Sequence, residues 1–175
     1  ALEGLQNTQI VITDKTGTLT EGKPSLEQIM PLSTVSEIEL IQITAELNAK
    51  SEHPIAQAFQ NKAKELSIPY VANKLVANVP GKGIQGMKNG KKVFLGNEAL
   101  IYQNQIEISI KIKDQVSKIQ SEGKTVSYIA MNNEIVGLAV IHDAIKPEVK
   151  ETISYLHNKK IEVIMLTGDH ERTAH

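Results

Sequence analysis

The chain has 175 residues, of which 41% are hydrophobic and 22% are charged. This mixture is typical of a folded chain with one domain or two small ones, and it excludes disordered and fibrous classes. The net charge is −1 and cysteine is absent, so we expect no nucleic-acid partner, no disulfide and no thiolate metal site. No apolar run approaches the roughly 20 residues that span a bilayer, so this piece is not expected to cross a membrane.

The first predicted element is a short β-branched strand over residues 9–13 that ends at Asp14. Such a run is typical of a strand buried on both faces of a parallel sheet. Asp14 opens the heptapeptide Asp-Lys-Thr-Gly-Thr-Leu-Thr. An aspartate there can attack phosphorus, while Lys15, the threonine hydroxyls and the amides around Gly17 can offset phosphoryl charge. An ordinary aspartate turn is the alternative, but seven consecutive residues of this kind favour catalysis.

A region of different character follows, and we interpret residues 25–137 as an inserted α+β domain. Its helical and strand signals, separated by hairpin turns, predict an antiparallel sheet with helices. Helices are expected at 35–49, 54–66 and 106–122, strands at 74–79, 84–87, 92–95, 125–131 and 135–141, and turns at Asn89-Gly90 and Asn132-Asn133.

The tetrapeptide Ser51-Glu52-His53-Pro54 lies between two of these helices. Proline suits the first position of a helix, so a capped loop with His53 as the cap is the simpler interpretation. Three residues before Ser51 stands Asn48, whose amide oxygen can accept a hydrogen bond.

The segment 81–86, Gly-Lys-Gly-Ile-Gln-Gly, imitates the GxGxxG pattern of dinucleotide sites. Its context is wrong for such a site, because a strand rather than a helix follows. We interpret it as a strand-linked loop in which Gly81 and Gly83 let a ligand approach the backbone. Gly96 and Asn97 follow the next strand, where capping of a helix by Asn97 is the alternative to a binding role.

A second apolar strand is predicted at residues 161–166, after an amphipathic crossover helix. It ends at Thr167, Gly168 and Asp169. Ligands of open α/β sheets bind beyond the carboxyl ends of the strands. Asp14 and Asp169 are therefore expected to meet if the two strands are neighbours.

The heptapeptide that starts at Asp14 resembles the phosphorylation signature of P-type ATPases, within the haloacid dehalogenase superfamily. The tripeptide 167–169 resembles the second signature, and residues 143–146, Asp-Ala-Ile-Lys, resemble a further element, for which a solvated ion pair is the alternative. Related phosphatases carry a second aspartate two positions after the nucleophile, where this chain has Thr16. Without that base an acyl phosphate persists, which suits a pump better than a phosphatase.

The tetrapeptide at 51–54 resembles the signature of the heavy-metal branch of this family. In that branch the histidine lies against the nucleotide, a glycine-rich loop and a Gly-Asn pair line the same pocket, and position 48 is often a glutamate that binds the adenine amino group. The resemblance implies a nucleotide-binding set consisting of Asn48, Glu52, His53, Gly81, Gly83, Gly96 and Asn97.

The resemblance also implies the fold class and the chemistry. The chain is expected to be α/β, with an incomplete haloacid dehalogenase-like (Rossmann-type) phosphorylation domain at 1–24 and 138–175 around the nucleotide-binding domain. The implied enzyme uses ATP and Mg²⁺, forms an aspartyl phosphate at Asp14 and exports a heavy-metal ion, copper by family frequency. The implied catalytic residues are Asp14, Lys15, Thr16, Thr167, Gly168 and Asp169, with Asp14 and Thr16 also at the metal.

The implied partners are the membrane and actuator domains of a full-length chain, with this piece on the cytoplasmic side of a membrane and monomeric by itself. A later Gly-Asp-Gly-x-Asn-Asp signature, whose first aspartate helps hold Mg²⁺, is absent. This piece alone is therefore expected to turn over ATP poorly or not at all. The alternatives are a haloacid dehalogenase-type phosphatase with a large cap, and a nucleotide-binding module without turnover.

Overall fold

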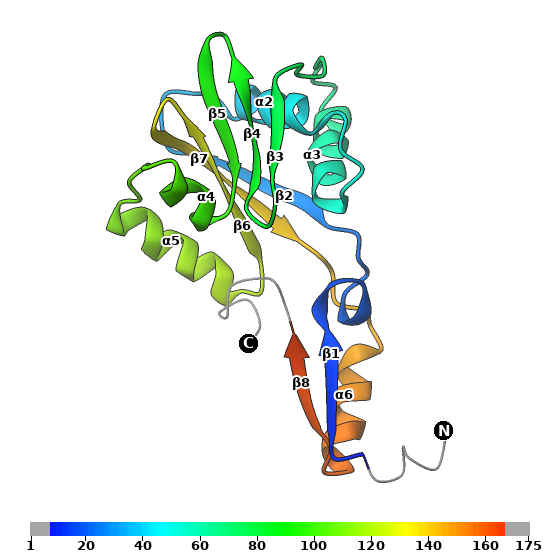
Figure 1. Ribbon diagram of the computed structural model, residues 1–175. Helices are drawn as coiled ribbons and strands as arrows, with labels where there is room; N and C mark the ends of the chain where they lie inside the picture. The colour runs from blue at the N-terminus through cyan, green and yellow to red at the C-terminus, as the bar shows by residue number, and fades with distance from the viewer. Residues whose placement is uncertain (1–7, 167–175) are drawn as a thin grey trace.

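A six-stranded antiparallel sheet forms the larger part of the computed structural model, which describes residues 8–166 (Figure 1). The strand order is β2-β7-β6-β5-β4-β3. Two-residue turns with left-handed backbones, Asn89-Gly90 and Asn132-Asn133, join β4 to β5 and β6 to β7 as predicted. The strands are β2 (Ser25–Pro31), β3 (Val76–Val79), β4 (Gly83–Lys88), β5 (Lys91–Gly96), β6 (Thr125–Met131) and β7 (Glu134–His142).

Two pairs of helices cover the two faces of this sheet. Helices α2 (Glu37–Asn48) and α3 (Pro54–Glu65) pack on the face that carries Val93 and Leu95 of β5. Helices α4 (Glu98–Gln103) and α5 (Ile110–Ser121) pack on the opposite face, which carries Phe94. Successive side chains of a strand point to opposite faces, so one strand supplies both apolar cores.

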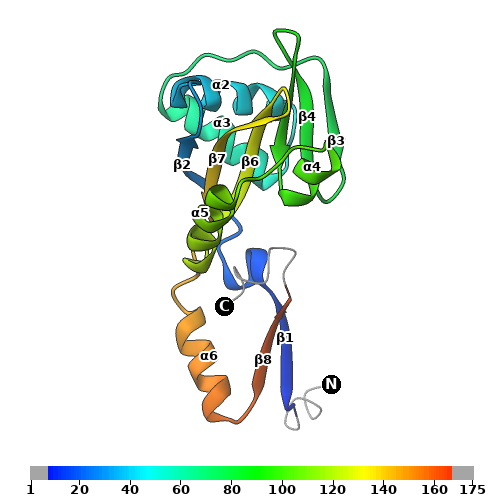
Figure 2. The same cartoon turned by 90° about the vertical axis from the view of Figure 1, so that its left-hand side faces the viewer.

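A smaller unit lies beyond one end of the sheet (Figures 1 and 2). It contains β1 (Ile10–Asp14), β8 (Glu162–Leu166), helix α6 (Val149–Asn158) and a π-type turn, η1 (Lys15–Leu19). Strands β1 and β8 pair in parallel, as the prediction of neighbouring strands requires. The α/β class and the antiparallel sheet of the insertion are thus confirmed.

The prediction that β1 is buried on both faces is wrong for the described chain. Ile12 is 62% exposed and Ile10 is 50% exposed, on the face that also carries Ile164. The intervening residues of β1 are partly buried, and α6 packs beside β8 with its aliphatic residues partly buried. Among residues 8–166, α6 is the one helix layered on this small sheet, so a single face is covered.

The two connections between the units leave the large sheet at one point, because Ser25 of β2 pairs with His142 of β7. Strand β7 runs past Gly137 to His142, so the predicted limit at 137 falls inside a strand. An inserted unit that keeps its sheet intact would span residues 25–142. Strand β2 was not predicted, and α4 was predicted only as a helix that Asn97 caps. Helix α5 begins later than its predicted start at 106, because its cap is Ser109.

Candidate functional site

Asp14 is the last residue of β1 and is exposed at the carboxyl end of the small sheet. It lies in parallel register with Leu166, the last residue of β8. Thr167, Gly168 and Asp169 follow directly and lie outside the described residues. The pairing that would bring Asp169 to Asp14 is present, and their meeting stays a prediction.

The backbone turns immediately after Asp14. The turn η1 is closed by a hydrogen bond from the Thr20 amide to the Lys15 carbonyl at 3.1 Å. Gly17 has a φ of +78°, in the region that glycine adopts without strain. Its amide donates to Thr20 Oγ1 at 3.1 Å, so this amide is occupied in the described arrangement. The predicted role of the amides around Gly17 toward a phosphoryl group stays a prediction.

Residues 143–146 hold this turn from the second connection. The Thr20 hydroxyl, 2% exposed, donates to Asp143 Oδ2 at 2.6 Å. The amide of Lys23 donates to Asp143 Oδ1 at 3.1 Å, and Lys146 Nζ donates to the Gly17 carbonyl at 2.9 Å. Asp143 and Lys146 therefore bind the turn rather than each other, and the alternative of a solvated ion pair between them is wrong.

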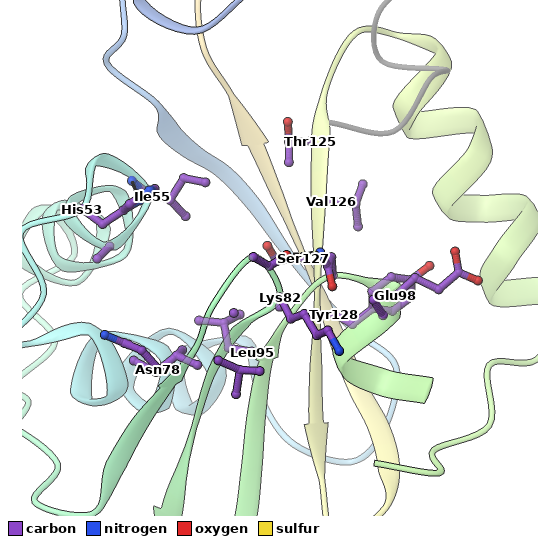
Figure 3. A pocket seen from close by; sticks show the side chains of 18 of the residues that line it. His53, Ile55, Asn78, Lys82, Leu95, Glu98, Thr125, Val126, Ser127 and Tyr128 are labelled. Carbon is purple, nitrogen blue, oxygen red and sulfur yellow. Dashed lines mark hydrogen bonds between the residues drawn. The ribbon is translucent and has the colours of Figure 1, made fainter. Parts of the chain in front are cut away.

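A cavity of about 1080 Å³ opens at the edge of the large sheet where β3 ends and β4 and β6 begin (Figure 3). The N-terminus of α3, residues 80–83 (called the glycine loop below) and helices α4 and α5 complete its walls. Glu52 is exposed and does not line the cavity. The other residues of the predicted nucleotide-binding set all line it: Asn48, His53, Gly81, Gly83, Gly96 and Asn97.

His53 caps α3, as predicted, and also lines the cavity. Its Nδ1 accepts a hydrogen bond from the Ile55 amide at 3.2 Å, so a neutral ring carries its hydrogen on Nε2. Behind it, Gln60 Nε2 donates to the carbonyls of Asn48 at 2.7 Å and Ser51 at 3.1 Å. This buried amide fixes the end of α2 against the start of α3.

The glycines that line the cavity differ in how much space a side chain would have. Gly83 and Gly96 face each other across β4 and β5. A Cβ on Gly83 would lie 2.2 Å from the Leu95 carbonyl oxygen, and one on Gly96 would lie 2.1 Å from the Lys82 carbonyl oxygen. Glycine is therefore required at these two positions because neighbouring backbone atoms occupy the space of a Cβ. A Cβ on Gly81 would meet no atom within 4 Å. Open space for a ligand is therefore present beside Gly81, and the predicted approach of a ligand to Gly81 and Gly83 stays a prediction.

Asn97 caps a helix, as one of its two predicted roles requires, while its binding role stays a prediction. Its Oδ1 accepts from the Leu100 amide at 3.2 Å and so caps α4. Its Nδ2 donates to the Gly81 carbonyl at 2.9 Å, and its backbone amide donates to the Lys82 carbonyl at 2.9 Å. One side chain thus fixes the glycine loop to the first turn of α4.

The α4–α5 wall contains polar residues that no sequence motif indicated. The Tyr102 hydroxyl donates to Glu98 Oε1 at 2.7 Å, and Lys113 Nζ lies 5.5 Å from the Tyr102 ring centroid. The interaction with Tyr102 is the main cause that raises the pKa of Lys113. Burial raises the pKa of Tyr128, on β6, to about 12. The sequence indicates these residues only through their helical spacing. That spacing does not show whether a polar face lines a cavity or faces solvent.

Metal ligands do not gather in the described part of the chain. Between residues 8 and 166, no three histidine or acidic side chains lie close enough together to hold an ion by themselves. Within the same residues, no helix has the length and apolar character that a membrane span requires.

The chain is similar to known proteins along nearly its whole length. The family model of haloacid dehalogenase-like hydrolases matches residues 8–175. A copper-transporting P-type ATPase of Rhizobium leguminosarum bv. viciae is 38% identical over 99% of this chain and 21% of its own length. A copper-exporting P-type ATPase B of Archaeoglobus fulgidus is 39% identical over 99% of this chain and 24% of its own length.

Among solved structures, a zinc-transporting PIB-type ATPase in the E2.Pi state matches with a TM-score of 0.67 and 29% identity. That match covers 99% of this chain and 28% of the transporter chain. The chain spans between a fifth and a quarter of the two relatives named above. It belongs to the haloacid dehalogenase-like hydrolase family, and the two relatives named above, to which it is similar, are P-type ATPases.

Proposed function

We propose that this chain is the ATP-binding, autophosphorylating part of a P-type ATPase that exports a heavy-metal ion. Asp14 is the phosphoryl acceptor, and the cavity of the large sheet is the ATP site. The observation that carries the proposal is the position of Asp14 at the carboxyl end of β1, next to β8 and followed by a turn that Thr20 and Asp143 hold. Ligands of α/β sheets bind at that end.

The proposed reaction is a direct phosphoryl transfer. One carboxylate oxygen of Asp14 bonds to the γ-phosphorus while the bond from that phosphorus to the β,γ-bridging oxygen breaks, and ADP leaves with the electron pair. Lys15, and main-chain amides of the turn other than that of Gly17, offset the charge on the phosphoryl oxygens. Thr167, Gly168 and Asp169 complete the site in this proposal.

ATP has to reach Asp14 from a site in the other unit. The two connections leave the large sheet side by side at Ser25 and His142, which suits a hinge between the units. Closure of that hinge would carry the γ-phosphate toward the turn after β1. In the cavity, the Nδ2 of Asn48 donates to the Thr44 carbonyl at 2.8 Å, so its Oδ1 is the amide atom proposed to accept from the adenine amino group.

Mg²⁺ is the proposed cofactor, with Asp14 and Thr16 as its protein ligands. Magnesium in phosphoryl-transfer sites keeps several waters and takes one or two carboxylates plus phosphate oxygens. A single described carboxylate at the carboxyl end of β1 fits that pattern, and Asp169 is the proposed second one. When bound, the ion would neutralise charge on the phosphoryl oxygens.

The exported ion and the partners are proposals of the same kind. The names of the two relatives mention copper, and the name of the matched structure mentions zinc. We propose copper as the exported ion. The proposed partners are the membrane and actuator domains of the full-length chain, with this part on the cytoplasmic side. A phosphatase of the same family is the second candidate, since the family model is that of hydrolases. Thr16 disfavours it, because it replaces the general acid and base.

Phosphorylation of the full-length protein by γ-labelled ATP tests the proposal. The wild type should acquire label that hydroxylamine removes, because hydroxylamine cleaves acyl phosphates, and Asp14→Asn should acquire none. Asp114→Asn, on an exposed position of α5, is the matched control and should label like wild type. Label that persists in Asp14→Asn would exclude Asp14 as the acceptor, and rapid release of phosphate with no adduct would favour the phosphatase.

A further inference from the structure

Three charged side chains line the cavity among the described residues: Lys82, Glu98 and Lys113. Glu98 and Lys113 share Tyr102, since the Tyr102 hydroxyl donates to Glu98 and its ring lies under the Lys113 ammonium group. A carboxylate and an ammonium group on one tyrosine offset each other's charge. Lys82 lies outside that cluster and supplies the unbalanced positive charge of the cavity wall.

The ammonium group of Lys82 contacts a neutral group. Its Nζ donates to Gln103 Oε1 at 2.7 Å, and the side chain runs from the glycine loop toward α4 (Figure 3). Within residues 8–166, Lys82 forms no ion pair with a carboxylate. An ammonium group has three N–H donors, so two donors and the full charge remain for an anionic ligand.

The backbone of Lys82 is fixed on both sides of the side chain. Its amide donates to the Val79 carbonyl at 3.0 Å, and its carbonyl accepts from the Asn97 amide at 2.9 Å. Gln103, at the last turn of α4, then fixes the far end of the side chain. A cation that is positioned before binding loses little conformational freedom when the ligand arrives.

We propose that Lys82 binds the polyphosphate of the nucleotide and that Gln103 positions its ammonium group. The inference rests on the proposed ATP site and deepens it by naming the residue that distinguishes nucleotides by phosphate charge. An ammonium group acts on phosphate as a point charge with rotatable donors, so it suits a flexible polyphosphate chain. The cavity should therefore bind ATP and ADP more tightly than adenosine, and Lys82 should supply that difference.

Calorimetric titration of the whole chain with adenosine, AMP, ADP and ATP, without divalent metal, tests the proposal. Lys82→Gln should weaken ATP binding by about tenfold, because hydrogen bonds to charged groups are among the stronger ones, and should change adenosine binding by less than about twofold. Lys82→Arg should retain most of the ATP affinity. Gln103→Glu should imitate Lys82→Gln although Lys82 is kept, because the new carboxylate neutralises the ammonium group.

Two lysines provide matched controls. Lys113→Gln removes an ammonium group that lies over the Tyr102 ring, on α5 and not between Gly81 and Gly83, so its effect on ATP should be smaller than that of Lys82→Gln. Lys111→Gln alters an exposed lysine of α5 outside the cavity wall and should bind ATP like wild type. ATP binding that Lys82→Gln leaves unchanged, or a loss equal for ATP and adenosine, overturns the role of Lys82 alone. A wild type that binds no nucleotide overturns the ATP site itself.

Discussion

The Thr20 hydroxyl donates to Asp143 Oδ2 at 2.6 Å, which joins two residues 123 positions apart. Thr20 belongs to the segment that leaves the small unit, and Asp143 belongs to the segment that returns to it. The same hydroxyl accepts from the Gly17 amide, so one oxygen links the return segment to the turn after Asp14. The position of that turn therefore depends on a contact outside the heptapeptide.

The first prediction is that Thr20→Val destabilises the turn. Valine has nearly the same shape but leaves Asp143 Oδ2 and the Gly17 amide without this partner. We expect a loss of about 1–2 kcal/mol in the free energy of unfolding, measured by denaturant titration, because a hydrogen bond contributes about 1 kcal/mol and both of these bonds are only partly buried. Labelling of Asp14 by γ-labelled ATP in the full-length protein should fall as well.

Thr20→Ser keeps the hydroxyl and should retain most of the stability. Thr34→Val, at an exposed loop position, should change the free energy of unfolding by less than about 0.5 kcal/mol. Equal stability of Thr20→Val and wild type would mean that the contact with Asp143 does not hold the turn.

The fold was predictable where local chemistry is decisive. Asn89-Gly90 and Asn132-Asn133 both adopt left-handed backbones, and each specifies a hairpin by itself. Strand β2 was missed because its register shifts between Leu26 and Gln28, which breaks the alternation of apolar and polar residues. The exposed face of β1 was also not predictable, because burial depends on which layers pack against a strand and not on the strand's own residues.

Some residues of the candidate site were likewise predictable from short motifs, and others were not. His53 and Asn97 were recognisable because capping and cavity lining are carried by short motifs. The partners of Lys82 and Lys113 were not recognisable, because Gln103 and Tyr102 meet them through the tertiary packing of α4. The sequence indicates that Gly83 lacks a Cβ for a reason, but it does not show that the backbone of Leu95 occupies that space.

The second prediction concerns the limits of the larger unit. A segment of residues 25–142 should unfold in one cooperative transition, because it contains the whole six-stranded sheet and both helical layers. A segment of residues 25–137 keeps only Gly137 of the β7 residues that pair with β2, opposite Pro31, and should have a lower melting temperature. Calorimetry of both segments is the test, and equal melting temperatures would contradict the limit at His142.

The third prediction compares the stability cost of alanine at two glycines with a positive φ. Gly83→Ala should lower the free energy of unfolding by about 1–3 kcal/mol or more, because overpacking has that cost and the new Cβ meets the Leu95 carbonyl. Gly90→Ala also has a positive φ but meets no atom within 4 Å, so its cost should be about 1 kcal/mol. Thermal unfolding of both variants checks the difference, and equal losses would show that backbone conformation alone sets the cost.

The fourth prediction follows from Tyr128. Its folded pKa of about 12 lies above the ordinary value of 10.0, because burial favours the neutral phenol. Below pH 10 both states keep the proton, so Tyr128 adds no pH dependence there. Between pH 10 and 12 the unfolded state ionises first, and the free energy of unfolding falls. Tyr128→Phe should show a shallower fall in denaturant titrations over this range, whereas Tyr155→Phe, at a residue 61% exposed, should keep the wild-type slope.

The fifth prediction tests His53, whose cap and proposed ligand contact can be separated. His53→Ala removes both and should weaken ATP binding by roughly tenfold or less, since an aromatic contact is worth about 0.5–1.5 kcal/mol. It should also lower stability, because loss of an N-cap costs about 1 kcal/mol. His53→Ser keeps a capping oxygen and removes the ring, so it should regain stability without regaining ATP affinity.

Calorimetric titration and thermal unfolding of His53→Ala and His53→Ser, with Asp14→Asn as a third variant, separate these effects. Asp14→Asn should bind ATP like wild type, because the proposed site for the base and ribose lies in the larger unit while Asp14 ends β1 of the smaller one. His53→Ser that recovered both stability and ATP affinity would reduce His53 to a helix cap. Loss of ATP binding in Asp14→Asn, with both His53 variants unaffected, would instead place the nucleotide at the phosphorylation turn.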